Sequence, residues 1–415
     1  MKPTRAAALV FLAALLARVL FLCLHGPLLA TDSESYLRLA ENLAGHGAFS
    51  LSPGPPFVPT IRRAPLYPAF LGLLHLAGLL RPGVVAALQA VVDSAVAVAV
   101  LVLAARVAGP AWALAAALAY AVHPGAIAAA ASLLGEALFT ALLVLAVTLL
   151  VRGRDREPPA LLCAAGAVFG LAALCRPIAL FLPFLCAAVL LAGRRAPQRG
   201  RTRLLLVPLA ALCVIAPWAV RCSRAAGRLV LVQGASAVNV YVPTRWDWDQ
   251  GDEARLWHVL APGDEYCRRL TAAGTPAAMA AADAFGYRQA VANVRADTGA
   301  YLRSRARTVP HLVLTTFDVF TGFNQSLARA RAEGRWARLV VKLALLALFS
   351  LLPLALAVIG LFRASGEVAA LCATLWLSTL LVHLPLWIEP RFWLPAVPFL
   401  LVGAAGGGAA LARRA

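Results

Sequence analysis

The chain has 415 residues, of which 61% are hydrophobic and only 14% are charged, and its mean hydropathy is +0.79. Soluble domains carry about 25% charged residues, so this composition excludes a soluble protein and predicts an all-α, polytopic membrane protein. The formal net charge of +19 would also fit a nucleic-acid partner. The basic residues are mostly arginines in short segments between apolar runs, however, and this pattern indicates membrane topology, with membrane lipids and no nucleic acid as partners.

About ten apolar segments approach the roughly 20 residues that a helix needs to cross a bilayer, and charged residues mark their ends. The basic, apolar N-terminus resembles a signal peptide. Its apolar stretch is long and is interrupted by Arg18, so we expect an uncleaved membrane anchor. The expected transmembrane helices cover residues 6–24, 84–105, 111–129, 136–151, 159–174, 178–192, 204–220, 339–362, 368–387 and 392–411.

The stretch PLYPAFLGLLHLAGLL, residues 65–80, is ambiguous, because counting it as a span would invert the orientation of every later helix. If it lies in the interface, the arginine clusters at 152–156 and 194–203 fall on the cytoplasmic side, as the positive-inside rule requires. We therefore expect a juxtamembrane helix, cytoplasmic termini and a bacterial inner membrane location. The expected units are a membrane core, residues 1–220, with a catalytic first outer loop, residues 25–83; a long outer loop, residues 221–338; and C-terminal membrane helices, residues 339–415.

The first outer loop contains TDSESYLRLAENLAGHGAFS, which places Asp32 and Glu34 at the start of an amphipathic helix directly after the first apolar run. Acidic residues in a first turn complement the helix dipole, so capping by Asp32 or Ser33 is one interpretation. The other interpretation is chemical, because paired carboxylates serve acid–base catalysis when they lie in a site.

The segment IRRAPLYP places Arg62 and Arg63 just before the juxtamembrane helix, at the height of lipid headgroups. A guanidinium binds phosphate bidentately and stays charged at any pH. An interfacial anchor shared with Tyr67 is the simpler interpretation for one of the two arginines.

Further charged residues lie in turns on the expected outer face. Glu136 begins an apolar helix, where its N-terminal position alone is favourable. Arg176 lies between two short spans, where it either binds an anion or snorkels to the surface. Glu389 and Arg391, in WIEPRFWLP, form a structural ion pair, or else Arg391 reaches the phosphate that Arg63 would bind.

Several other polar residues are candidates for structural or metal-binding roles. Cys222 and Cys267 fall in the long outer loop and are candidates for one disulfide. Asp93 lies within the second span, where a carboxylate needs a partner, and Arg18 is the candidate. The acids Asp247, Asp249, Asp252 and Glu253 are spaced as in some calcium sites but lack the ordered ligands of an EF-hand.

Five stretches, taken together and in this order, resemble bacterial members of the C-type membrane glycosyltransferases, the superfamily of the protein O-mannosyltransferases and the aminoarabinose transferase of lipid A. They are DSESYLRLAENLAGHGAFS, RRAPLYPAFLGLLHLAG, LLGEALFTALLVLAV, LAALCRPIALFLPFL with APWAVRCSRAAGRLV, and EPRFWLPAVPFLLVGAA. The resemblance implies an inverting glycosyltransferase that moves a sugar from a polyprenyl-phosphate carrier to the hydroxyl of an acceptor lipid, glycan or protein.

The resemblance also implies roles for individual residues. Asp32 matches the catalytic acid of the first loop, acting as base toward the acceptor hydroxyl, and Glu136 matches a second acid. The resemblance matches Arg63 and Arg176 to positions that face the carrier phosphate, and Arg391 to the arginine of the late EPR turn. The remaining candidate site residues are Arg62 for the phosphate, Glu34 as a supporting acid or metal ligand, and Tyr67, Arg221 and Glu389 as supporting residues.

This sequence departs from the family at Cys222, which stands where many relatives have Asn after PWxxR. Two other functions stay open: a flippase or transporter for lipid-linked glycans, and a glycan ligase or polymerase with a polyprenyl-diphosphate donor. A transporter would place polar residues deep in several spans, whereas here the ionisable residues gather at helix ends. No cofactor is predicted with certainty, and the need for a divalent metal is left open.

Overall fold

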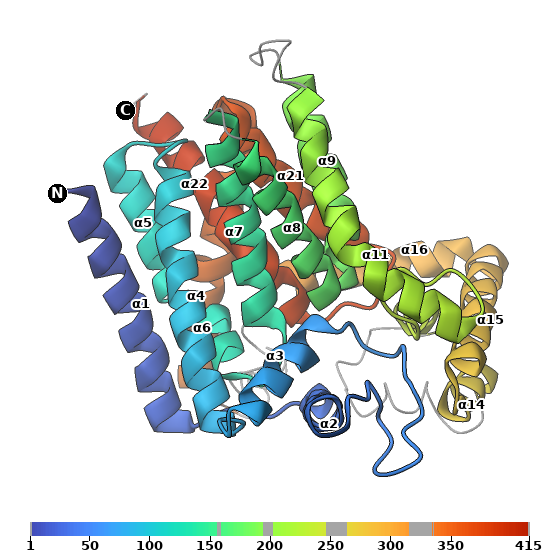
Figure 1. Cartoon of the computed structure of the whole chain (residues 1–415). Helices are drawn as coiled ribbons and strands as arrows, with labels where there is room; N and C mark the ends of the chain where they lie inside the picture. The colour runs from blue at the N-terminus through green and yellow to red at the C-terminus, as the bar shows by residue number, and fades with distance from the viewer. Residues whose placement is uncertain are drawn as a thin grey trace.

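A computed structural model describes residues 2–155, 159–193, 202–245, 264–314, 334 and 336–413 (Figure 1). In these ranges every extended regular element is helical, and the β-structure is limited to two isolated bridges, Leu28 with Ser132 and Ser50 with Pro59. The predicted all-α membrane fold is confirmed.

Long apolar helices form the body of the molecule, and α1 turns leucine side chains outward along its length: Leu12, Leu16 and Leu24 are 61%, 68% and 70% exposed. Such a surface requires lipid around it. The helices of the body are α1 (Pro3–His25), α4 (Pro82–Ala104), α5 (Pro110–Ala121), α6 (Pro124–Ala131), α7 (Glu136–Asp155), α8 (Ala160–Cys175), α9 (Leu182–Ala192), α11 (Leu206–Ala226), α19 (Trp336–Leu346), α20 (Leu352–Arg363), α21 (Glu367–His383) and α22 (Val397–Ala412), joined by the short turns η1 (Pro177–Phe181), η2 (Thr202–Leu205), η4 (Ala347–Leu351) and η5 (Pro390–Ala396).

Six of the described helical segments are long and apolar enough to cross a membrane, and a bent pair adds a seventh. The expected segments at 159–174, 178–192 and 368–387 correspond to apolar helices of 10–17 residues, so the structure does not establish the expected ten spans. The expected helix at 111–129 is wrong as a single element, because α5 and α6 meet at a bend of 46°. Pro124 causes the break, since proline lacks an N–H and restricts the residue before it.

A buried charged pair joins α1 to α4. Arg18 donates to Asp93 at 2.7 Å from Nε and 2.5 Å from Nη2, and it also donates to the carbonyls of Ala14 and Ala121 at 2.9 Å. Tyr120 donates to the other Asp93 oxygen at 2.7 Å. The predicted partnership of Arg18 with Asp93 is confirmed, and every oxygen and both terminal nitrogens of the pair are satisfied.

The last helix, α22, lies inside the body and packs closely on α20 (Figure 1). A Cβ at Gly407 would lie 1.9 Å from the carbonyl oxygen of Leu356, so only glycine permits this approach. The close packing gives a rigid base to η5, the turn that carries Arg391 just before α22.

Two short helices lie across one end of the body, which we name the α2–α3 end: α2 (Thr31–His46) and α3 (Leu66–Leu76) (Figure 1). At 1.5 Å per residue, the 11 residues of α3 extend about 16 Å, which is too short to span a bilayer. The predicted juxtamembrane helix is therefore present. Its Gly72 packs against the backbone of Ala40 in α2, so the two helices form one unit.

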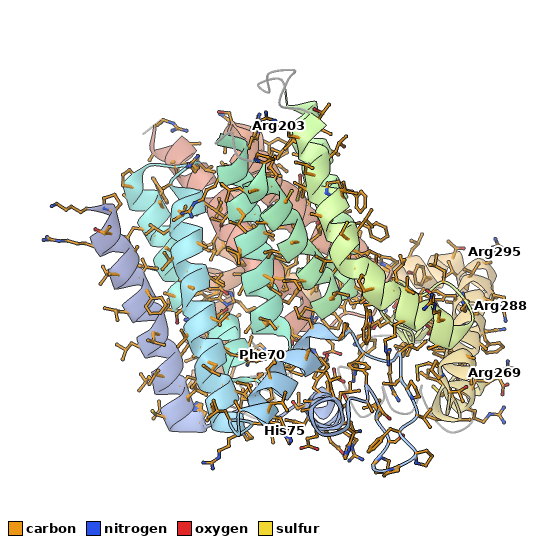
Figure 2. All side chains as sticks on the ribbon, in the orientation of Figure 1. Phe70, His75, Arg203, Arg269, Arg288 and Arg295 are labelled. Atoms are coloured by element: carbon orange, nitrogen blue, oxygen red, sulfur yellow. The ribbon has the colours of Figure 1, made fainter. Side chains whose placement is uncertain are left out.

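The long loop folds into a helical unit beside α11, made of α12 (Val238–Tyr241), η3 (Val242–Thr244), α14 (Glu265–Thr271), α15 (Pro276–Ala296) and α16 (Thr298–Leu314). Figure 2 shows Arg269, Arg288 and Arg295 along the side of this unit that faces away from the body. Cys222 and Cys267 are both free, buried thiols, which corrects the candidate disulfide. The proposed calcium ligands between Asp247 and Glu253 lie outside the described residues.

Candidate active site

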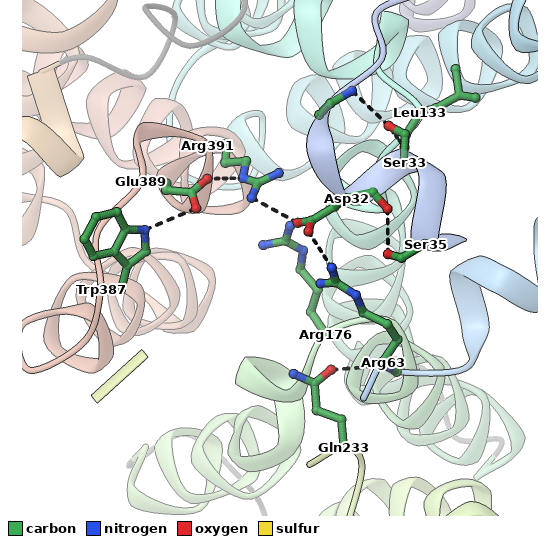
Figure 3. A network of polar contacts seen from close by, with 12 residues as sticks. Asp32, Ser33, Ser35, Arg63, Leu133, Arg176, Gln233, Trp387, Glu389 and Arg391 are labelled. Carbon is green, nitrogen blue, oxygen red and sulfur yellow. Dashed lines mark hydrogen bonds and ion pairs between the residues drawn. The ribbon is translucent and has the colours of Figure 1, made fainter. Parts of the chain in front are cut away.

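Segments far apart in the chain meet at the α2–α3 end and place three carboxylates against three arginines. Figure 3 shows two of the carboxylates, Asp32 and Glu389, with the three arginines. The carboxylates come from the start of α2, the start of α7 and the turn before η5. The arginines come from the segment before α3, the turn after α8 and η5 itself. The six residues, which we name the carboxylate–arginine cluster, are Asp32, Arg63, Glu136, Arg176, Glu389 and Arg391.

Asp32 lies between two arginines. Arg63 pairs with one carboxylate oxygen, and Arg391 donates to the other at 3.2 Å. Burial raises the pKa of Asp32, but the charges and hydrogen bonds of Arg63 and Arg391 together outweigh burial and hold that pKa below its ordinary value. The side chain keeps 28% of its surface exposed, so an ionised carboxylate is accessible from outside.

Ser33 performs the capping role that was one interpretation of Asp32. Its hydroxyl accepts from the N–H of Ala30 at 3.0 Å and donates to the carbonyl of Leu133 at 2.9 Å. These bonds fix the start of α2 against the segment that precedes α7. Asp32 is therefore free of any capping role and faces the arginines.

Glu136 is the most buried acid of the cluster, with 1% of its side chain exposed. One carboxylate oxygen pairs with Arg176 and lies 3.6 Å from Nε of Arg391. The other, Oε2, is buried and has no hydrogen-bond partner among the described residues. A buried acceptor without a donor is costly, so this oxygen is suited to a group that arrives with a ligand.

Arg391 contacts all three carboxylates. It lies 2.5 Å from Glu389, 3.2 Å from Asp32 and 3.6 Å from Glu136. The indole N–H of Trp387 donates to Glu389 at 3.2 Å and orients it. The three arginines and three carboxylates balance, so the cluster carries no formal net charge when all six residues are ionised.

Aromatic side chains support the cluster. The guanidinium of Arg63 lies 5.2 Å from the ring of Tyr36, and that of Arg176 lies 5.5 Å from the ring of Phe392. Tyr67 lies behind them, fully buried, and donates to Gln89 at 2.9 Å. Gln89 in turn donates to the carbonyls of Ala130 and Ser132 at 3.1 and 2.6 Å, which holds the segment leading to Glu136.

Besides Tyr67, three predicted residues lie outside the cluster. Glu34 has 82% of its side chain exposed and pairs with Arg38 at 3.2 Å, because residues two apart on a helix point in different directions. Arg62 is exposed and forms no ion pair among the described residues, whereas its neighbour Arg63 turns inward to Asp32. Arg221 stacks on Trp218 and Phe49 at 4.5 and 5.3 Å and donates to the carbonyl of Thr60 at 3.2 Å.

The sequence interpretation missed residues 232–239, which we name the strap. Gly234 donates to the carbonyl of Ile61 at 2.7 Å, and the side-chain oxygen of Gln233 accepts from the N–H of Ala64 at 3.1 Å (Figure 3). Farther along, the carbonyl of Asn239 accepts from the N–H of Trp387 at 2.6 Å. The strap therefore joins the segment that carries Arg63 to the turn that carries Arg391.

Asp283 of α15 holds the strap in its shape. Its carboxylate accepts from the backbone N–H groups of Ser236 at 3.0 Å and Ala237 at 2.9 Å. Burial raises the pKa of Asp283 above its ordinary value, although these bonds oppose the rise. Ala235 has a φ of 58°, which is costly for a residue with a side chain and persists because the neighbouring bonds enforce it. A Cβ at position 234 would clash with Ile61, so the backbone can approach Ile61 only with glycine there. This glycine is the one local sign of the strap in the sequence.

No group of three His, Cys, Asp or Glu side chains suited to a metal occurs among the residues that the structure describes. The carboxylates of the cluster are each paired with arginine instead. Arginine and metal ions both stabilise phosphate charge, so the donor set present here fits an anionic ligand directly.

Comparison with protein-family models matches part of the chain. Residues 62–220 match the family model described as dolichyl-phosphate-mannose-protein mannosyltransferase, a range that includes Arg63, Glu136 and Arg176. No curated protein matches the chain by sequence.

Solved structures share the fold at low sequence identity. The oligosaccharyltransferase of Archaeoglobus fulgidus in the apo form is 14% identical, with a TM-score of 0.56 over 97% of this chain and 50% of that chain. The same enzyme tethered with an acceptor peptide gives 14% identity and a TM-score of 0.50 over 99% and 49%. ArnT from Cupriavidus metallidurans in the apo state is 16% identical over 100% of this chain and 78% of that chain, with a TM-score of 0.45.

The chain thus spans about half the length of the archaeal oligosaccharyltransferase that it matches. Residues 62–220, fewer than half of the chain, match that family model, and the fold is shared with the archaeal enzyme. Both findings agree with the resemblance predicted from the sequence, and the chain is a polytopic membrane protein with this fold.

Proposed function

We propose that the chain is an inverting glycosyltransferase that moves a sugar from a polyprenyl-phosphate carrier to an acceptor hydroxyl at the outer face of a bacterial inner membrane. The observation that carries this proposal is the position of Asp32, an accessible and ionised carboxylate between Arg63 and Arg391. This arrangement supplies a base and a phosphate-binding site side by side. With the α2–α3 end outside, both termini lie in the cytoplasm.

In this mechanism Asp32 accepts the proton of the acceptor hydroxyl as its oxygen attacks the anomeric carbon of the donor sugar. The attack comes from the face opposite the phosphate, so the configuration inverts. The bond from the anomeric carbon to the phosphate oxygen breaks, and its electron pair stays on the phosphate. Arg63, Arg176 and Arg391 stabilise the charge that develops there.

The cluster also suggests how the base becomes active. Without a donor, Arg63 and Arg391 pair with Asp32 and keep its pKa low, which makes it a weak base. A donor phosphate draws the same arginines toward itself. Asp32 then loses the charges that lowered its pKa, so its basicity rises while the acceptor is in place.

We assign Glu136 a positioning role. It is buried and forms an ion pair with Arg176, so it orients that guanidinium toward the phosphate rather than contacting the acceptor. Its unpaired oxygen is the place where a sugar hydroxyl, or a divalent metal, finds a partner when the donor binds.

The alternatives fit the geometry less well. A flippase would need polar groups along a path through the bundle. The charged pair Arg18 and Asp93 lies inside the bundle, but its polar groups are already hydrogen-bonded within the protein, and the pair joins two helices. A ligase or polymerase with a diphosphate donor would add a second negative charge to a cluster that is already neutral. A monophosphate carrier brings only one negative charge and so disturbs this balance less.

Purified protein in lipid vesicles, supplied with a panel of radiolabelled polyprenyl-phosphate sugars and a membrane extract as acceptor source, tests this function. We expect sugar from one donor to appear on an acceptor. Movement of the intact donor between leaflets without cleavage would establish the flippase instead, and turnover of only diphosphate donors would establish the ligase or polymerase.

The pH dependence of transfer tests the pairing of Asp32 with Arg63. The base works only when deprotonated, so kcat/KM falls as pH drops through the pKa of Asp32, which in the free protein lies below the ordinary 3.8. Arg63→Gln removes the largest effect that lowers this pKa, so the pKa rises and the fall begins at higher pH. We expect the acidic limb of kcat/KM, measured from about pH 2.5 to 8 so that the wild-type limb falls inside the range, to move to higher pH in Arg63→Gln.

Arg62→Gln is the matched control, because it removes the neighbouring, exposed arginine. Its acidic limb should stay close to that of the wild type. An unchanged limb in Arg63→Gln would show that Asp32 is not the group whose ionisation governs transfer.

A further inference from the structure

A second feature of the α2–α3 end is a cavity of about 490 Å³, a volume within the range of small-molecule binding sites. It lies between the C-terminal part of α2, the loop that follows it, the start of α3 and the end of α11. Its lining includes Phe49, Phe57, Ala69, Trp218 and Arg221.

Arg221 is the one charged residue of this lining, and it forms no ion pair with a carboxylate among the described residues. Its guanidinium is held by the rings of Trp218 and Phe49, at 4.5 and 5.3 Å, and one nitrogen donates to the carbonyl of Thr60. Five N–H donors are available on a guanidinium, so this positioned cation keeps donors for a ligand. A half-buried positive charge without a counter-ion favours an anion beside it.

The rest of the lining limits the ligand. Every other lining side chain is apolar, with aromatic walls from Phe49, Phe57 and Trp218. A sugar ring or a polar peptide would bury hydroxyl or amide groups that find no side-chain partners here, which is unfavourable. An apolar chain that carries one anionic group satisfies both the walls and Arg221.

The cavity shares a wall with the proposed active site. Pro59 and Pro65 line the cavity, while Arg63, between them, turns to Asp32. The donor phosphate already has the arginines of the carboxylate–arginine cluster, so the cation of Arg221 serves another molecule. We propose that this cavity binds the acceptor, an anionic amphiphile whose anionic group lies on Arg221 and whose apolar part lies among the aromatic walls. The identification of this ligand as the acceptor rests on the proposed function. The binding of an anionic amphiphile in the cavity does not depend on it.

Binding is tested by fluorescence of the purified protein in a neutral maltoside detergent, because Trp218 is part of the wall. The probe is dodecyl phosphate brominated along its chain, and the comparison is a brominated dodecyltrimethylammonium salt of the same length. We expect the anionic probe to quench a component of the emission that is missing in Trp218→Phe. Equal quenching by both probes would show detergent-like adsorption and overturn the site.

Arg221→Gln should weaken the anionic probe about tenfold, the loss expected for one charge-assisted hydrogen bond. Arg224→Gln, three residues farther along α11 and exposed, is the matched control and should bind as the wild type does. Ala69→Phe fills the cavity without removing Arg221 or adding a tryptophan, and it should abolish the quenching. If the probe binds Arg221→Gln and Ala69→Phe as tightly as it binds the wild type, the cavity is not its site.

The acceptor assignment needs one further measurement. Dodecyl phosphate should inhibit sugar transfer in the wild type, and raising the donor concentration should not relieve the inhibition. Relief by the donor would mean that the cavity holds the donor chain, which overturns the assignment. If no sugar transfer is found at all, the proposed function fails, while the fluorescence results still decide whether the cavity binds an anionic amphiphile.

Discussion

Asp32→Asn is expected to lower sugar transfer at least about 100-fold while the donor still binds, because a positioned general base contributes roughly 10² to 10⁴ in rate. The amide keeps the size of the side chain and an acceptor oxygen for one arginine, but it cannot take the proton of the acceptor hydroxyl. Arg63, Arg176 and Arg391 remain in place for the phosphate. The measurement is kcat for transfer from a saturating polyprenyl-phosphate sugar, with donor affinity measured separately.

Glu34→Gln is the control for this prediction, because it makes the same chemical change two residues along α2 at a side chain that points outward. It should transfer sugar as the wild type does. A loss of donor binding in Asp32→Asn that accounts for the whole fall in transfer would contradict the role of Asp32 as base.

Arg18→Met is expected to lower the free energy of unfolding by about 3 to 5 kcal/mol, the cost of leaving one member of a buried ion pair alone. The variant leaves Asp93 uncompensated between α1 and α4, with 2% of its side chain exposed. It also removes the hydrogen bonds that Arg18 donates to Ala14 and Ala121. Thermal or denaturant unfolding in a fixed detergent measures the change.

The double variant Arg18→Met with Asp93→Leu provides the control, because removing both charges leaves no buried ion without a partner. It should recover most of the loss, apart from the bond of Tyr120 to Asp93. A double variant no more stable than Arg18→Met would show that the two charges are not energetically coupled. Since the pair lies apart from the carboxylate–arginine cluster, the folded double variant should retain sugar transfer.

The composition of the chain determined that it is a helical membrane protein, because an unbroken apolar run in lipid has few alternatives to a helix. Arginines at segment ends decided that α3 is a juxtamembrane helix, and the length of that helix in the structure agrees. The pairing of Asp93 with Arg18 followed from the cost of an isolated charge in a membrane helix. The bend at Pro124 was missed, although proline gave a local signal, because an apolar run alone does not show where a helix breaks.

Sequence patterns also singled out the members of the carboxylate–arginine cluster, since a charged residue in an otherwise apolar turn stands out. Charge patterns alone did not separate Arg63 from Arg62, or Asp32 from Glu34; the family resemblance favoured Arg63 and Asp32. The direction of a side chain depends on the helical phase of its element and on what packs against it, and both were decided by the fold. Arg221 likewise faces a cavity rather than the cluster, because the end of α11 packs against Phe49 of the first loop.

The strap was invisible in the sequence because its contacts are made mostly by backbone groups, which every residue carries. Arg391 and Asp32, 359 positions apart, meet only because α22 is packed inside the body and carries η5 to the start of α2. The sequence by itself therefore determined which residues needed polar partners in an apolar environment. The tertiary structure decided which partners they have, because distance in space depends on the packing of whole helices and not on any local pattern.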